Sequence, residues 1–240
     1  MKGQSAKPGK NTDGQGRART GDGALIPKHG GYRRLKTFAL AEFIYDVTVR
    51  FCDLYINPRS RTHDQMVQAA RSGVQNIVEG SQDSGTSKKI EMKLTNIARG
   101  SLEELHRDYR DYLRQRGRPE WPPEHPAMKR FKALRCADLE TFRRWVSQEA
   151  RNDKNTDLHG RTRTGWSDQA GRCSSVSVRV GSFGSTLPSA VVAANGALSL
   201  LNLCCYLLDR QLAAQAEAFT AQGGFTERLY RHRSRARRKP

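Results

Sequence analysis

Residues 188–222 read PSAVVAANGALSLLNLCCYLLDRQLAAQAEAFTAQ and contain the longest apolar segment of the sequence, residues 198–208. Apolar residues recur there at alternating three- and four-residue steps, which predicts one long helix with a heptad-like seam. The seam comprises Val191, Ala194, Leu198, Leu201, Cys205, Leu208, Leu212, Ala216 and Phe219, and a second apolar line comprises Leu200, Cys204 and Leu207. A helix that is apolar on two faces either lies at the centre of a bundle or shares one face with another subunit.

Two further helices are expected well upstream of this stretch. The first carries apolar residues at helical steps and stops before Pro58; these residues are Leu40, Phe43, Val47, Phe51 and Leu54. Ser60 or Thr62 caps the second, which runs to about Val78, and Gly80 is expected to follow it as a left-handed C-cap. The inward positions of the second helix are Met66, Ala69, Ala70, Gly73 and Ile77.

A third helix and a shorter one complete the pattern. The third begins near Thr86 and Ser87 and ends at Gly117, and its predicted apolar stripe is Ile90, Leu94, Ile97, Ser101, Leu105, Tyr109 and Tyr112. A shorter amphipathic helix is expected at residues 127–149, and no strand pattern of useful length occurs. The sequence therefore predicts an all-α protein, an antiparallel four-helix bundle with an extra short helix.

Composition divides the chain of 240 residues into ordered and disordered parts. Hydrophobic residues make up 36% of it, which is low for one compact globule. Residues 1–32 are predicted to form a disordered basic tail, residues 33–150 the first three bundle helices and the short accessory helix, and residues 151–187 a long disordered insertion. Residues 188–222 form the last bundle helix, and residues 223–240 form a basic C-terminal suffix with seven Lys or Arg against one Glu.

The charge balance and the cysteines limit the classes of partner and compartment. The chain holds 42 Lys and Arg against 24 Asp and Glu, a formal net charge of +18, which attracts polyanions such as nucleic acid. The 5 Cys include no CxxC pair, and we expect free thiols in a reducing compartment. The first residues lack the apolar stretch of a secretion signal, and no run approaches the length of a membrane span. A cytoplasmic protein without a membrane partner is expected.

Several stretches of the sequence resemble a known family. They are QMVQAARS (65–72), NIVEGS (76–81) and IARGSLEEL (97–105), with LLDRQL (207–212) and GGFTERLYR (223–231) near the end. They are similar to the bacterial four-helix-bundle family of the 23S ribosomal RNA intervening-sequence protein, which includes the accessory protein of diversity-generating retroelements, in its variant with a four-helix-bundle suffix domain. The resemblance implies a bundle that assembles into a ring-like homopentamer with a basic surface. In the retroelement branch that surface binds nucleic acid and a reverse transcriptase. The tails and the 151–187 insertion depart from the short family form.

Five residues of these motifs form a predicted structural motif: Asn76, Glu79, Gly80, Gly100 and Ser101. Asn76 and Glu79 lie one turn apart, and we expect them to cap or cross-link the turn between the second and third helices. Ser81, Thr86 or Ser87 would be their partners. A ligand-binding pocket at this place is the alternative.

Basic residues form the candidate nucleic-acid site. These residues are Lys88, Lys89 and Lys93 on the third helix and Arg228, Arg231, Arg233, Arg235, Arg237, Arg238 and Lys239 in the suffix. The suffix cations have little acidic compensation and include Tyr230 among them, a composition suited to phosphate contact with base stacking. The lower half of the third helix, where Asp108 and Asp111 accompany Arg110 and Arg114, is instead expected to be a salt-bridged surface.

No catalytic, metal or cofactor site is predicted. Glu103 and His106 have the spacing of half of a di-iron site, but the last helix supplies no second histidine. We therefore expect a non-enzymatic, self-associating accessory protein that binds RNA or DNA largely non-specifically. The alternative is a protein–protein scaffold with no nucleic-acid role, docking a partner through Phe225, Leu229 and Tyr230 or through the short helix.

Overall fold

A computed structural model describes residues 29–159 and 188–237, and it is all-helical over those residues, with no strand among them. The elements are η1 (Tyr32–Arg34), α1 (Lys36–Tyr55), α2 (Arg61–Asp83), α3 (Lys88–Gln115), α4 (Pro126–Leu134), α5 (Leu139–His159), α6 (Pro188–Gln222) and α7 (Phe225–Arg237). The predicted all-α class is confirmed.

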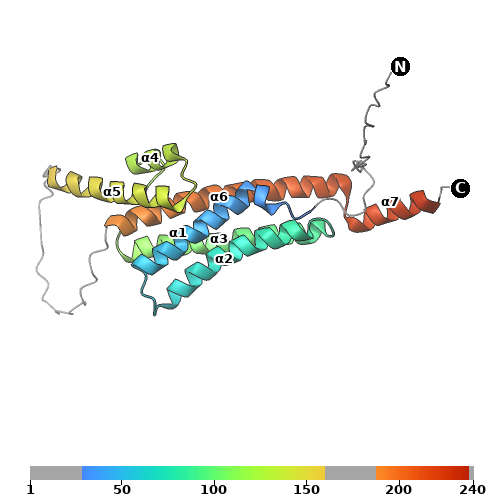
Figure 1. Cartoon of the computed structure of the whole chain (residues 1–240), viewed down its shortest axis with the longest axis horizontal. Coiled ribbons are helices and arrows are strands. Elements are labelled where there is room, and N and C mark those ends of the chain that lie inside the picture. The colour runs from blue at the N-terminus through green and yellow to red at the C-terminus, as the bar shows by residue number, and fades with distance from the viewer. Residues whose placement is uncertain (1–28, 160–187, 238–240) are drawn as a thin grey trace, which may run out of the picture.

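Helices α1, α2, α3 and α6 lie alongside one another (Figure 1). α1 packs against α2 and α6, and α3 packs against α2 and α6. α5 and α4 lie against one end of α6, and α7 extends from the opposite end of the molecule (Figure 1). The accessory helices α4 and α5 therefore lie at one end of the long axis of the molecule, and α7 lies at the other.

The first half of α6 is the centre of the core. Every residue from Ala190 to Leu198 is buried, because α1, α3, α4 and α5 all contact this helix. Both predicted apolar lines of α6 contribute, since Leu201 and Cys204 are also fully buried. A helix that is apolar on two faces was expected either to lie at the centre of a bundle or to share one face with another subunit. The first half of α6 occupies the central position. Leu203 and Tyr206, further along, remain exposed.

Local signals account for most helix ends. Ser60 caps α2 by accepting a hydrogen bond from the Thr62 backbone N–H at 3.3 Å, and Ser87 caps α3 by accepting one from Ile90. Gly117 follows α3 with φ +63°, as expected from the sequence. The predicted C-cap at Gly80 is wrong, because α2 continues to Asp83. Gly80 is instead buried inside the helix, where an added Cβ would lie 3.3 Å from the backbone oxygen of Glu91.

The segment predicted as one short helix at residues 127–149 forms two helices. α4 ends at Leu134, the following Arg135 adopts a left-handed conformation with φ 46°, and α5 begins after Asp138. Asp138 accepts hydrogen bonds from both the backbone and the hydroxyl of Thr141 at 2.8 Å, which caps α5. α5 then runs to His159, so the first residues of the insertion expected to be disordered, 151–159, are helical. Residues 160–187 lie outside the described residues.

The predicted stripe of α3 is correct in its second half and displaced in its first. Leu105, Tyr109 and Tyr112 are buried as expected, whereas Ile90 and Ile97 are exposed. The buried residues of the first half are Thr95, Ala98 and Leu102. The small residues Thr95 and Ala98 permit a close approach of the neighbouring helices, and the pattern of large apolar residues does not reveal this.

One helical stretch, Ser189–Ser234, is long and apolar enough to cross a membrane by length and composition alone, which the sequence analysis did not expect. Within its apolar window 72% is buried inside the protein, as is usual for a core helix.

Candidate nucleic-acid interface

α7 begins at a sharp turn made by two glycines. Gly223 has φ +72° and donates its backbone N–H to the Phe219 carbonyl at 2.9 Å, which ends α6. The Glu227 carboxylate accepts a hydrogen bond from the Gly224 N–H at 2.9 Å, as the third residue of a helix does in a capping box. These bonds fix the direction in which α7 leaves α6.

α7 docks against the turn between α2 and α3. The Arg228 guanidinium donates to the backbone oxygen of Gly85 at 3.3 Å. The His29 side chain packs against the same glycine, since a Cβ added to Gly85 would lie 2.7 Å from Nδ1 of the His29 ring. Gly30 donates to the Ser81 carbonyl at 3.0 Å, so the chain entering α1 crosses the same end. Segments from three parts of the sequence, residues 29–30, 81–85 and the start of α7, therefore meet at what we call the basic end.

The predicted suffix cations occupy different environments. Arg228 is half-buried at the docking contact, and Arg231 donates to the Glu227 carbonyl at 3.4 Å. Arg233 and Arg237 are exposed. Arg235 lies in α7, but the structure does not describe its side chain. Arg238 and Lys239 lie outside the described residues.

The three lysines at the start of α3 also lie at the basic end, but they are not equivalent. Lys88 pairs with the half-buried Glu91 at 2.8 Å. Glu91 also accepts a hydrogen bond from Gln215 of α6 at 3.2 Å, so this pair belongs to the packing of α3 on α6. Lys89 and Lys93 are exposed and, four residues apart, share one face of α3.

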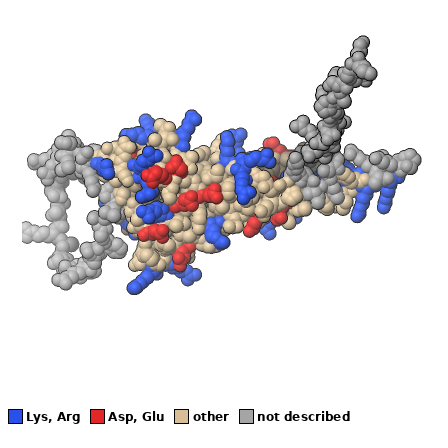
Figure 2. Space-filling view, in the orientation of Figure 1, with Lys and Arg blue, Asp and Glu red and all other residues tan. Residues whose placement is uncertain are grey.

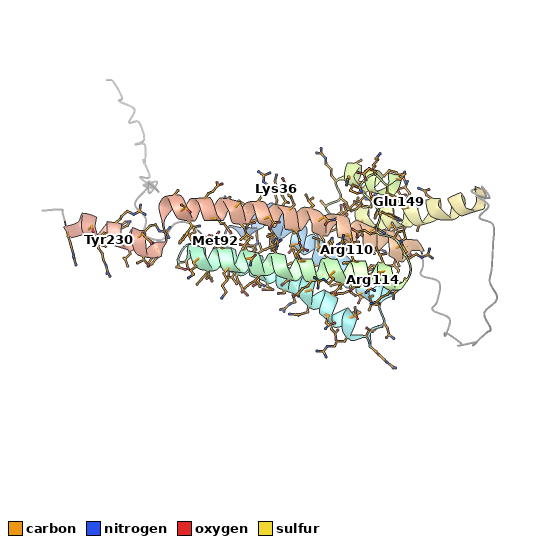
Figure 3. The ribbon with its side chains drawn as sticks, turned by 180° about the vertical axis from the view of Figure 1, so that it is seen from behind. Lys36, Met92, Arg110, Arg114, Glu149 and Tyr230 are labelled. Carbon is orange, nitrogen blue, oxygen red and sulfur yellow. The ribbon has the colours of Figure 1, made fainter. Side chains whose placement is uncertain are left out.

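Most ion pairs among the described residues lie away from this end. Arg110 pairs with Glu120 at 2.7 Å and Arg114 with Asp111 at 2.9 Å, so the lower half of α3 is salt-bridged as predicted. On the face drawn in Figure 2, acidic and basic side chains lie together over the body of the molecule, whereas basic side chains project from α7. Figure 3, seen from behind, places Tyr230 of α7 at the opposite end from Arg114 and Glu149.

Two cations of the basic end were not predicted. Arg33 and Arg34 of η1 are exposed beside the start of α1, and Arg33 lies over the ring of Tyr32 at 5.0 Å. The sequence signal for them is the pair of arginines directly before the first helix. Their place beside α2 depends on the long-range contacts of His29 and Gly30, which no local pattern reveals.

The predicted structural motif lies along the contact between α2 and α3. The Asn76 amide donates to the Ser72 carbonyl at 2.8 Å and to its hydroxyl at 3.2 Å, and that hydroxyl lies 3.1 Å from the Ser101 hydroxyl. Asn76 therefore links the two helices through Ser72 and not through Ser81, Thr86 or Ser87. Glu79 is exposed, and Gly100 has open space beside it.

The remaining polar groups offer little chemistry. Among the described residues no group of three or more His, Cys, Asp and Glu side chains could hold a metal ion. The four cysteines within the described ranges, Cys52, Cys136, Cys204 and Cys205, are free thiols, and burial raises the pKa of Cys52 and of Cys205 to about 12. Burial also lowers the pKa of His106, with a smaller effect from Arg110. Cys173 lies outside the described residues.

A groove of about 880 Å³ lies between α4 and α6. Its lining is mostly apolar and includes Trp121, Met128, Phe131, Leu203 and Tyr206. The groove lies beside α4, which is at the opposite end of the molecule from α7 (Figure 1).

Comparison of the chain with protein-family models, curated proteins and solved structures finds no match.

Proposed function

We propose that this chain is a non-enzymatic, oligomeric four-helix-bundle protein that binds nucleic acid largely non-specifically through its basic end, as an accessory factor to a larger assembly. One observation carries the proposal: Arg233 and Arg237 of α7 are exposed, and the single glutamate of that helix already accepts the hydrogen bond that starts it. Exposed cations with few acidic neighbours are what phosphate contact requires.

The geometry supports binding by charge and not by sequence. Arg233 and Arg237 on α7 and Lys89 and Lys93 on α3 are exposed on separate helices at one end of the molecule. Such a surface meets the phosphate backbone, which carries no sequence information. Lys88, which pairs with Glu91, positions α3 in this proposal and does not contact phosphate.

The proposal has a measurable salt dependence. If these four exposed cations each neutralise one phosphate, raising salt from about 50 to about 200 mM weakens binding roughly 50- to 150-fold. A fluorescence-anisotropy titration with RNA and with DNA at both concentrations tests this.

A pair of charge-matched variants locates the site. Arg233→Gln with Arg237→Gln removes two positive charges from α7, and Arg110→Gln with Arg114→Gln removes two from the salt-bridged half of α3. The first should weaken binding strongly and reduce the salt dependence, and the second should change little. Equal effects of the two variants, or binding that salt does not weaken, would contradict the proposal.

The assembly is part of the same proposal. We infer that α1, α2, α3 and α6, each packed on two of the others, form an antiparallel four-helix bundle, and that copies of the chain associate, up to a pentamer. The motif resemblance to the 23S ribosomal RNA intervening-sequence family supports this, as do the exposed Ile90 and Ile97 on α3. The four cysteines within the described residues are free thiols, which supports a location in the reducing cytoplasm. Light scattering of the purified chain tests its association.

The groove between α4 and α6 favours a second function, a protein–protein scaffold. Leu203 and Tyr206 are exposed apolar residues that line it, and such clefts commonly take partner side chains. Leu203→Asp should abolish capture of a defined partner under this function, and neutralising the α7 arginines should not.

A further inference from the structure

α7 presents two different faces. Arg228 and Arg231, three residues apart, share the face that meets the rest of the molecule through Gly85. Tyr230, Arg233 and Arg237 follow one another at three- and four-residue steps and share the opposite face. We call these three residues the stacking face.

The Tyr230 ring is displayed to solvent and is not used in packing. It is 73% exposed, the highest value among the large apolar side chains exposed in the described part of the chain. Phe225 and Leu229 of the same helix are, by contrast, half-buried. The ring is thus free to receive a flat partner on its face.

The helix that carries the ring is held in place before any ligand binds. The Gly224–Glu227 bond fixes its first turn, and the Arg228–Gly85 bond fixes it against the turn between α2 and α3. Since these contacts are made already, a ligand has less ordering entropy to supply on binding.

We propose that the stacking face selects single-stranded nucleic acid over duplex, an inference that rests on the proposed function and deepens it. The Tyr230 ring stacks on an unpaired base, and the guanidinium groups of Arg233 and Arg237 contact the flanking phosphates. An aromatic ring accepts the π-face of any base, so the stack adds affinity without sequence preference. In a duplex these faces are covered by neighbouring base pairs, and only the phosphates remain for the arginines.

The arginine spacing suits this arrangement. Arg233 and Arg237 are four residues apart, which is about 6 Å along a helix axis, and Tyr230 lies about 4.5 Å before Arg233 on the same side. The ring and the two charges therefore form one line along the exposed side of α7, with the ring at one end.

The test uses the full chain and labelled oligopyrimidines of about 12 nucleotides, a length within the site size of one single-strand binding module. Each is measured single-stranded and as a duplex of the same length, at one fixed salt concentration. The variants are Tyr230→Ala, Tyr230→Phe and Tyr206→Ala, and all leave the net charge unchanged. Tyr206 is the matched control because it is also an exposed tyrosine, 56% exposed, but lies on α6 in the groove beside α4.

We expect Tyr230→Ala to weaken single-strand binding at least about fivefold, the lower end of what one stacked base contributes, and to change duplex binding less than about twofold. Tyr230→Phe should keep single-strand affinity, because the ring and not the hydroxyl stacks. Tyr206→Ala should leave both affinities unchanged.

Failure of this inference differs from failure of the proposed function. Salt-sensitive binding that Tyr230→Ala leaves unchanged, or weakens equally for single strand and duplex, overturns the stacking face and leaves the electrostatic function standing. Absence of binding to either form by the unaltered chain overturns both.

Discussion

Gly196 lies in α6 beneath two aromatic rings of α5, and replacing it with alanine is expected to destabilise the protein. An added Cβ would lie 2.7 Å from Cζ3 of Trp145 and 2.9 Å from Cε2 of Phe142. Neither ring has space to move, because Trp145 also packs on Phe131 with ring centroids 4.4 Å apart and both α5 rings are buried. The methyl group must therefore push α5 away from α6.

The size of the effect follows from two opposing contributions. Overpacking a close contact of this kind costs about 1–3 kcal/mol. Alanine in place of glycine inside a helix gains about 0.5–1 kcal/mol in backbone entropy. Gly196→Ala should therefore lower the free energy of unfolding by up to about 2.5 kcal/mol.

Gly100 provides the matched control for this substitution. It also lies inside a long helix, α3, but an added Cβ there meets nothing within 4 Å. Gly100→Ala should keep only the favourable contribution and raise the free energy of unfolding by about 0.5–1 kcal/mol.

Thermal and urea unfolding followed by far-ultraviolet circular dichroism measures both variants against the unaltered chain. A change of 1 kcal/mol corresponds to about 2–4 °C in Tm for a chain of this size, so opposite signs are resolvable. A Gly196→Ala protein as stable as the Gly100→Ala protein would refute the reasoning, because it would mean that the rings of α5 do not lie on Gly196.

Two further predictions concern the ends of the molecule. Arg130 donates two hydrogen bonds of 2.7 Å to the buried Glu149 carboxylate and holds its pKa below the ordinary 4.5. Glu149→Gln should therefore cost about 1–2 kcal/mol near pH 7, and the difference should shrink as the pH falls below about 4.5, which urea unfolding at several pH values measures. A difference that stays constant in acid would contradict the ion pair. Gly223→Ala places a side chain at φ +72°, at a cost of roughly 1–2 kcal/mol, and should loosen α7 without unfolding the body. Trypsin should then cleave after Arg228 faster while the urea midpoint of the body is unchanged, and an unaltered cleavage rate would count against the turn.

The sequence predicts the long helices well because their ends carry strong local signals. Ser60, Ser87 and Gly117 each mark a boundary with a side chain or a backbone conformation that a helix end needs. The end of α4 has no such signal, since a left-handed Arg135 is rare, but the start of α5 has one in Asp138, a helix N-cap that the sequence analysis overlooked. Gly80 misled the prediction because a glycine serves a helix end and a close helix contact equally well, and only the packing against α3 distinguishes the two.

Some features of the candidate site can be predicted from the local sequence, and others depend on contacts between residues far apart in the chain. The arginines of the suffix are evident from composition, and a glycine pair followed by Thr226 and Glu227 is a helix-start pattern that the sequence analysis overlooked. The contact of Arg228 with Gly85 joins residues 143 positions apart, and no local pattern encodes it. The pairing of Lys88 with Glu91, three residues on in the same helix, is a local pattern that the sequence analysis overlooked, whereas the bond between Gln215 and Glu91 depends on the packing of α6 against α3.

The family-like motifs on α2 and α3 lie away from the residues that carry the proposed function, whereas the family-like stretch GGFTERLYR (223–231) covers the start of α7 itself. Ser72, Asn76 and Ser101 bridge α2 and α3, and Gly73 is where Leu102 fits, since an added Cβ there would lie 2.7 Å from that side chain. These residues are explained by the close approach of two helices, and any bundle with this approach would favour them. They therefore support the fold and carry no information about binding. A variant such as Ser101→Val should change stability and leave nucleic-acid affinity unaltered, whereas function has to be tested on α7.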